Sequence, residues 1–190
     1  MKLFDTRGYA LVRGVRIMDA RLHLHWSALA LAAALLALWI RQPVLALEAA
    51  GSYFGVLLLH EMGHAAMARR LGYRATDIRL AFMHGLCEFD SPDTLRDDAL
   101  IAWGGVLAQL AVALPLIALA QVPAFAGLPA AGIPVAVFGY FSVLVALFNL
   151  TPAAPLDGAK AWRLVPILLG DRRTRAIARK ATQDLMQRLK

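Results

Sequence analysis

The chain has 190 residues, of which 59% are hydrophobic and only 17% are charged. Soluble domains contain about 45–50% apolar and about 25% charged residues, so this composition excludes an ordinary soluble enzyme and a disordered tail. The single cysteine, Cys87, excludes an intrachain disulfide. The net charge of +7 is not accompanied by an aromatic-basic platform or a helix-turn-helix pattern. We therefore expect a lipid bilayer, and no nucleic acid, as the partner of the basic side chains.

Four apolar stretches predict membrane-spanning helices, in chain order at residues 22–40, 44–68, 99–122 and 134–149. The longest uncharged stretch, residues 99–156, holds 58 consecutive residues without Asp, Glu, Lys or Arg. A single crossing needs about 20 apolar residues, so this stretch is long enough for two. We predict an all-α polytopic membrane protein with about four transmembrane helices plus a short C-terminal helix.

Two other segments have patterns of their own. The loop at residues 72–95 is apolar and partly alternating, with a central Gly85, which is typical of a small β-hairpin. Such a hairpin would either offer a free strand edge to an extended substrate or only cover the core.

Residues 1–170 are expected to form a single membrane-embedded domain. Residues 171–190 are basic and amphipathic, and they predict a cytoplasmic tail that lies on the membrane surface.

Lysine and arginine are distributed unevenly between the predicted helices. Five precede the first helix, one follows it, five lie in residues 69–98, none in residues 121–133 and nine after Asp157. Positively charged loops stay on the cytoplasmic side of a membrane. The pattern predicts a multi-pass protein of the plasma (inner) membrane with both termini in the cytoplasm.

Three ionisable residues lie together in the second apolar stretch, in the sequence His60-Glu61-Met62-Gly63-His64. An ionisable residue at the centre of a transmembrane helix costs about 2.5–3.5 kcal/mol, so its presence indicates a function. Residues four apart share a helix face, so both imidazoles can reach one ion. Glu61 is turned about 100° from His60 and can touch a water without binding the ion. This is the HExxH arrangement of zinc hydrolases, with two histidine ligands and a glutamate base.

A catalytic zinc usually takes three protein ligands and leaves a fourth position open. The candidates for the third ligand near apolar stretches are His23, His25, Glu48, His84 and Asp157. Asp157 is favoured because it follows a helix end broken by two prolines, where irregular backbone lines a cavity. The charge pattern also places Asp157 on the same side of the membrane as the histidine pair.

The two motifs together resemble those of the site-2 protease family of intramembrane zinc metalloproteases. The motif HEMGH lies in one apolar helix, and Asn149-x-x-Pro152 with Leu156-Asp157-Gly158 ends a later one. The resemblance implies an intramembrane zinc endopeptidase. Such an enzyme cleaves transmembrane segments of protein substrates by metal-activated water, in regulated intramembrane proteolysis or in the clearance of remnant peptides.

The resemblance also implies a role for each motif residue. It predicts one Zn²⁺ per chain held by His60, His64 and Asp157, with Glu61 as the catalytic base and Asn149 as a second catalytic residue.

The chain departs from the family pattern at two positions, because Val106 and Gln109 stand where many members have proline and asparagine. A compact form is expected, without the PDZ or paired CBS domains of many bacterial relatives.

Three alternative functions fit part of the pattern. A HExxH protease acting on soluble or lipid-modified termini would need a downstream glutamate as ligand, and only the loop residue Glu88 follows the motif. A catalytically silent membrane metal-binding or chaperone-like protein fits the ligands but not the intact Glu61. A small transporter with a proton relay leaves the Asn149–Gly158 motif unexplained. We expect Cys87 to be an inert core side chain and His84 to have a structural or substrate-side role.

Overall fold

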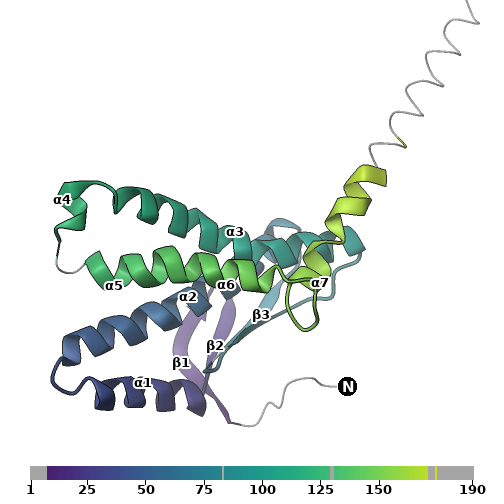
Figure 1. The fold of residues 1–190 in the computed structure, drawn as a ribbon. Helices are drawn as coiled ribbons and strands as arrows, with labels where there is room; N and C mark the ends of the chain where they lie inside the picture. The colour runs from purple at the N-terminus through teal and green to yellow at the C-terminus, as the bar shows by residue number, and fades with distance from the viewer. Residues whose placement is uncertain (1–7, 83, 129–130, 171–173, 175–190) are drawn as a thin grey trace, which may run out of the picture.

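The structure is a computed structural model that describes residues 8–82, 84–128, 131–170 and Thr174. The long helices lie side by side in Figure 1, and a small sheet packs beside them. The principal helices are α1 (Trp26–Leu38), α2 (Pro43–Arg70), α3 (Leu95–Leu119) and a continuous rod of α5 (Gly132–Pro134), η2 (Val135–Phe141) and α6 (Ser142–Asn149). Short helices α4 (Pro123–Ala126) and α7 (Gly158–Ala161) follow α3 and α6, and residues 164–170 are also helical.

The two longest helices have ends that their sequences favour. Helix α2 begins at Pro43, whose fixed backbone angle suits the first turn, and ends with Arg69 and Arg70 beside the exposed carbonyls. Helix α3 begins after Thr94, whose side chain accepts a hydrogen bond from the backbone N–H of Asp97 at 3.0 Å. These signals favour the observed ends of α2 and the observed start of α3.

Four strands form one mixed sheet in the order β1-β2-β3-β4: β1 (Tyr9–Ile17), β2 (Ala20–His25), β3 (Ala75–Leu80) and β4 (Gly85–Phe89). The β1–β2 and β3–β4 pairs are antiparallel, whereas β2 and β3 are parallel. One face of the sheet packs on α2 through a cluster of buried residues: Ala20, Leu57, Ala65, Ala75, Ile78, Leu80 and Cys87. The sheet is thereby fixed against the helix that carries the histidine motif.

The other face of the sheet is polar. Asp77 is only 5% exposed, and it bonds the Arg21 guanidinium at 2.9 Å and His23 Nε2 at 2.8 Å. Burial raises the pKa of Asp77, but the hydrogen bonds from Arg21 and His23 outweigh it and leave the pKa below its ordinary value. Arg79 and Glu88 form a second ion pair at 3.0 Å. Such a face is unsuited to lipid tails, so it lies toward a polar medium.

The prediction of an all-α protein with about four transmembrane helices is wrong. Within the described residues, three helices are long and apolar enough to span a membrane: Pro43–Arg70, Leu95–Leu119 and Gly132–Asn149. The expected first helix at residues 22–40 is instead strand β2 followed by α1, whose 13 residues are too short for a crossing.

The physical reason for the error lies in the period of the pattern. Arg21, His23 and His25 alternate with apolar residues, which is the period of a strand with one polar face. The hairpin suggested for residues 72–95 does form, as β3 and β4, but it is half of the four-stranded sheet. The predicted tail at residues 171–190 lies outside the described residues, apart from Thr174.

Helices α2 and α3 approach one another closely at a pair of glycines. A Cβ atom added to Gly63 would lie 2.3 Å from the carbonyl oxygen of Gly104, and one added to Gly104 would lie 2.4 Å from the carbonyl oxygen of Gly63. Small residues at such contacts let transmembrane helices pack backbone to backbone. This contact sets the distance between the histidine helix and its main neighbour.

We predict that Gly63→Ala destabilises the protein by about 1–3 kcal/mol, because the added methyl group has no space without moving α3. The matched control is Gly51→Ala in the same helix, where nothing lies within 4 Å of the new methyl group. Thermal unfolding in detergent should show a lower midpoint for the first variant only. Equal midpoints for both variants would contradict the close contact.

Candidate metal centre

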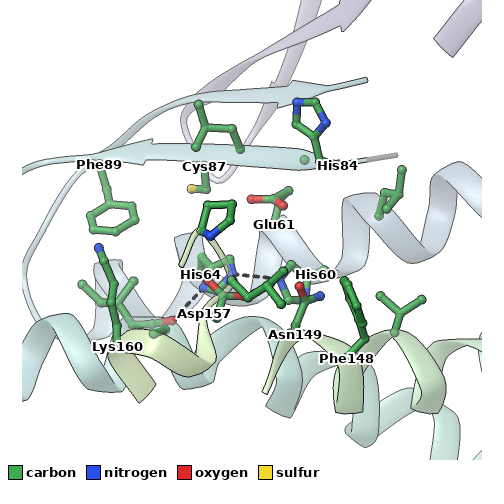
Figure 2. A pocket seen from close by; sticks show the side chains of 18 of the residues that line it. His60, Glu61, His64, His84, Cys87, Phe89, Phe148, Asn149, Asp157 and Lys160 are labelled. Atoms are coloured by element: carbon green, nitrogen blue, oxygen red, sulfur yellow. Dashed lines mark hydrogen bonds and ion pairs between the residues drawn. The ribbon is translucent and has the colours of Figure 1, made fainter. Parts of the chain in front are cut away.

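His60 and His64 lie one turn apart on α2 and are buried. Their Nε2 atoms are 3.0 Å apart. The Asp157 Oδ2 atom, at the start of α7, lies 2.9 Å from the Nε2 of His60 and 3.2 Å from that of His64 (Figure 2). Three groups from two distant parts of the sequence therefore direct one atom each at a common point.

The other ring nitrogens of the two histidines have oxygen partners. His60 Nδ1 lies 3.0 Å from Gln109 Oε1, and His64 Nδ1 lies 2.7 Å from the backbone carbonyl oxygen of Ile101. Because an oxygen of this kind only accepts, each Nδ1 donates an N–H, and Nε2 is the ring nitrogen that can offer a lone pair to a metal ion. Outer hydrogen bonds of this type orient metal-binding histidines in known metal sites.

Gly105 of α3 allows the two rings to lie against that helix. A Cβ atom at this position would come within 2.7 Å of atoms in both imidazoles, so any larger residue would displace them. The absence of a side chain at Gly105 is therefore a requirement of the site.

Asp157 is held in place by contacts of the segment around it. The Trp103 indole donates to the carbonyl of Ala161 at 3.0 Å, and the Trp162 indole donates to the carbonyl of Leu150 at 2.6 Å. Lys160 forms an ion pair with Asp98 at the start of α3, at 2.9 Å. These bonds fasten the irregular backbone between α6 and α7 to its surroundings.

The carboxyl group of Asp157 is kept ionised by the two imidazoles. Burial raises its pKa, but in the absence of a metal ion the hydrogen bonds that it accepts from the Nε2 atoms of His60 and His64 outweigh this effect, so that the pKa lies well below its usual range. A carboxylate in this position is a metal ligand or a partner for a cation.

Glu61 lies beside the three donor atoms on the side of the β3–β4 hairpin (Figure 2). It is only 4% exposed, and its carboxylate accepts a hydrogen bond from the backbone N–H of Cys87 in β4. A Cβ atom at Gly85 would lie 2.3 Å from Glu61 Oε1, so this glycine leaves the space that the carboxylate fills. Strand β4 thus determines where the Glu61 side chain points.

The residues present fit a zinc ion. A tetrahedral zinc with bonds of about 2.0–2.1 Å places its ligand atoms roughly 3.3 Å apart. The three donor atoms are separated by 2.9, 3.0 and 3.2 Å, so small outward shifts would accommodate the ion. Two neutral imidazoles and a carboxylate are a donor set that zinc prefers, and they leave one position open.

A cavity of about 590 Å³ gives access to this centre. One wall is β4 with its turn, the opposite wall is the α6 rod, and His60, Glu61, His64 and Asp157 lie between them. Asn149, at the end of α6, also lines the cavity and reaches toward the histidines in Figure 2. The chamber is mostly apolar around a small polar centre, which is typical of a ligand or substrate site.

The remaining candidates for the third ligand are placed elsewhere. His23 bonds Asp77 on the polar face of the sheet, and His25 accepts from the backbone N–H of Ser27 as the cap of α1. Glu48 is three turns before His60 on the same helix, about 18 Å away. His84 lines the cavity but does not join the donor cluster.

Cys87 also lines the cavity, beside Glu61. Burial, together with the nearby charges of Glu61 and Glu88, raises its pKa to about 12. The side chain is therefore a neutral thiol at physiological pH, and it contributes packing rather than nucleophilic chemistry.

The sequence alone did not identify several residues that build the site. The pattern of motifs left the roles of Gly105 and Gln109 open. It gave no sign that Gly85 supports Glu61 or that Trp103 supports the segment of Asp157. The available hint for Gly105 was a small residue four positions before Gln109 in an apolar helix.

Comparison with known proteins agrees with this geometry. The "Site-2 Protease from Methanocaldococcus jannaschii" superposes with a TM-score of 0.62 over 82% of this chain and 71% of that protein, at 23% sequence identity.

This chain has the fold of a site-2 protease. The resemblance expected from the motifs is confirmed.

A sequence relative points the same way. The Mycobacterium tuberculosis protein named "Putative zinc metalloprotease Rip3" is 36% identical over 109 residues. The match covers 56% of this chain and 28% of that protein, so the chain spans less than a third of its length. No protein-family model matches the chain. The site-2 protease fold and the three apolar helices indicate an integral membrane protein.

We predict that the purified protein binds a single zinc ion per chain and that His64→Ala abolishes this binding, because two donors cannot hold the ion as three do. The control is His84→Ala, which removes a histidine that lines the cavity outside the donor cluster. Elemental analysis after dialysis against zinc and then buffer gives the stoichiometry. Zinc retained by His64→Ala, or lost by His84→Ala, would contradict the assignment.

Proposed function

We propose that this chain is an intramembrane zinc endopeptidase that cleaves transmembrane segments of membrane proteins. The observation that carries the proposal is the convergence of His60, His64 and Asp157 on one point, with a buried Glu61 beside them in a shared cavity. The proposed ligands are these three residues and the proposed catalytic residues are Glu61 and Asn149. A protein that only stored a metal would have no need of a carboxylate held next to the ligands.

Zinc, when bound, supplies the Lewis acidity that peptide hydrolysis requires. The residues of the chain transfer the proton and orient the substrate. The Glu61 carboxylate, steadied by the backbone N–H of Cys87, takes the proton from the attacking water and returns it to the leaving amine. Asn149, on the opposite wall of the cavity, offers an amide that can orient the substrate carbonyl.

The substrate we propose is an unwound transmembrane segment. A helix keeps its carbonyls hydrogen-bonded, so the substrate must be extended where it is cut. Strand β4 is an edge strand of the sheet, and most of its residues line the cavity. An extended peptide lying along β4 would bring its backbone to the zinc ligands and Glu61. Regulated proteolysis and clearance of remnant peptides both fit this substrate class.

The proposed location is the plasma (inner) membrane, with both termini in the cytoplasm. This orientation follows from the Lys and Arg of residues 69–98 and of the region after Asp157. His60 is nine residues, or about 14 Å, from Arg69 at the cytoplasmic end of α2. The centre would then lie below the membrane surface but within reach of water from the cytoplasm.

The alternative is a catalytically silent membrane protein that kept the metal ligands. The burial of Glu61 and its contacts with β4 favour the enzyme, since a silent protein gains nothing from a carboxylate buried at a cost.

We predict that purified protein in detergent cleaves a transmembrane reporter peptide and that Glu61→Gln lowers the rate at least about 100-fold, since the amide cannot take a proton. The variant should keep its zinc, because Glu61 is not a ligand. Mass spectrometry of the products measures the rate. Cleavage by the variant at the wild-type rate would contradict the role of Glu61, and no cleavage by the wild type would favour the silent alternative.

We predict that Gly85→Ala lowers the cleavage rate about 10- to 100-fold while zinc binding stays unchanged. The added methyl group would occupy the position of Glu61 Oε1 and turn the carboxylate away from the donor cluster. Gly51→Ala, which fills open space on α2, is the control. Loss of zinc from Gly85→Ala would show a general collapse of the site and would contradict a specific effect on Glu61.

A further inference from the structure

Gln109 is the buried polar side chain of the site that the proposed reaction does not use. It lies in α3, is 0% exposed, and accepts a hydrogen bond from His60 Nδ1 through Oε1, at 3.0 Å. Its amide nitrogen, Nε2, has no hydrogen-bond partner among the described residues. Buried polar groups in proteins are usually hydrogen-bonded, so an amide that is paired at one end only needs an explanation.

The two histidines are supported in different ways. The partner of His64 Nδ1 is the backbone carbonyl of Ile101, which can only accept a hydrogen bond. The partner of His60 Nδ1 is a side-chain amide with an accepting and a donating end. The protonation of His64 is therefore fixed by the backbone, whereas that of His60 depends on one side chain.

The orientation of this amide decides which nitrogen of His60 carries the proton. With Oε1 toward the ring, Nδ1 holds the hydrogen and Nε2 offers a lone pair to the point shared with His64 and Asp157. With Nε2 toward the ring, the amide would donate to Nδ1, and the hydrogen would move to the ring nitrogen that faces the ion. A neutral His60 could not then act as a ligand.

We propose that Gln109 is a positioning residue that keeps the proton of His60 on Nδ1 and thereby sets the affinity of the centre for zinc. This inference rests on the proposed zinc site. It assigns a function to one of the two positions at which the sequence departs from the family pattern.

The test compares three variants of the full chain in detergent. Gln109→Met keeps the size of the side chain but offers only a weakly accepting sulfur, whereas Gln109→Glu still accepts a strong hydrogen bond. Ser142→Ala is the matched control, because Ser142 is also fully buried, and its hydroxyl also has no partner among the described residues. Zinc affinity is measured by competition with a chelator. We expect Gln109→Met to bind zinc about 10- to 100-fold more weakly, and Gln109→Glu and Ser142→Ala to bind at least as tightly as the wild type.

A second readout does not depend on zinc. In ¹⁵N-histidine NMR spectra of the metal-free protein, we expect the Nδ1 proton of His60 to exchange slowly with water in the wild type and faster in Gln109→Met. Wild-type affinity in Gln109→Met, an equal loss in Ser142→Ala, or a wild-type His60 that carries no proton on Nδ1 would overturn the proposal. A wild type that binds no zinc would instead refute the proposed function, and the NMR result would still decide the role of Gln109.

Discussion

The structure depends on the convergence of three donor atoms inside a membrane-spanning helix bundle. His60, His64 and Asp157 place nitrogen and oxygen atoms within 3.2 Å of one another, in an environment where an isolated charge is costly. Three donor atoms this close together are stable when they share a cation and when the other polar atoms of the same side chains are hydrogen-bonded. The surrounding architecture supplies those outer bonds through Gln109, the carbonyl of Ile101 and the backbone segment fastened by Trp103 and Trp162.

Close backbone packing makes this convergence possible. Gly63 and Gly104 let α2 and α3 touch, and Gly105 lets both imidazoles lie against α3. The sheet acts from the other side, because Gly85 and the backbone of Cys87 direct Glu61 toward the donor atoms. Helix α2 and the segment before α7 thus carry the proposed ligands, while strand β4 directs the Glu61 side chain, which we propose to move the proton.

Local patterns in the sequence predicted the proposed ligands but not their supports. The spacing of His60 and His64 places them on one helix face whatever the rest of the fold does, and the prolines before Asp157 end α6 where a cavity can form. Two features hid the sheet from the sequence analysis. Strand β2 pairs with β3 across a long sequence distance. The apolar residues that follow His25 also continue directly from β2, so that the strand and α1 together look like one apolar helix. The contact of Gln109 with His60 joins residues 49 apart, and no local pattern encodes it.

The most direct test of the central claim is X-ray diffraction from crystals of the zinc-loaded protein, recorded on both sides of the zinc absorption edge. The account predicts a single anomalous peak per chain, at bonding distance from the Nε2 atoms of His60 and His64 and from a carboxylate oxygen of Asp157. A peak elsewhere, or ordered side chains at this point without any peak, would contradict it.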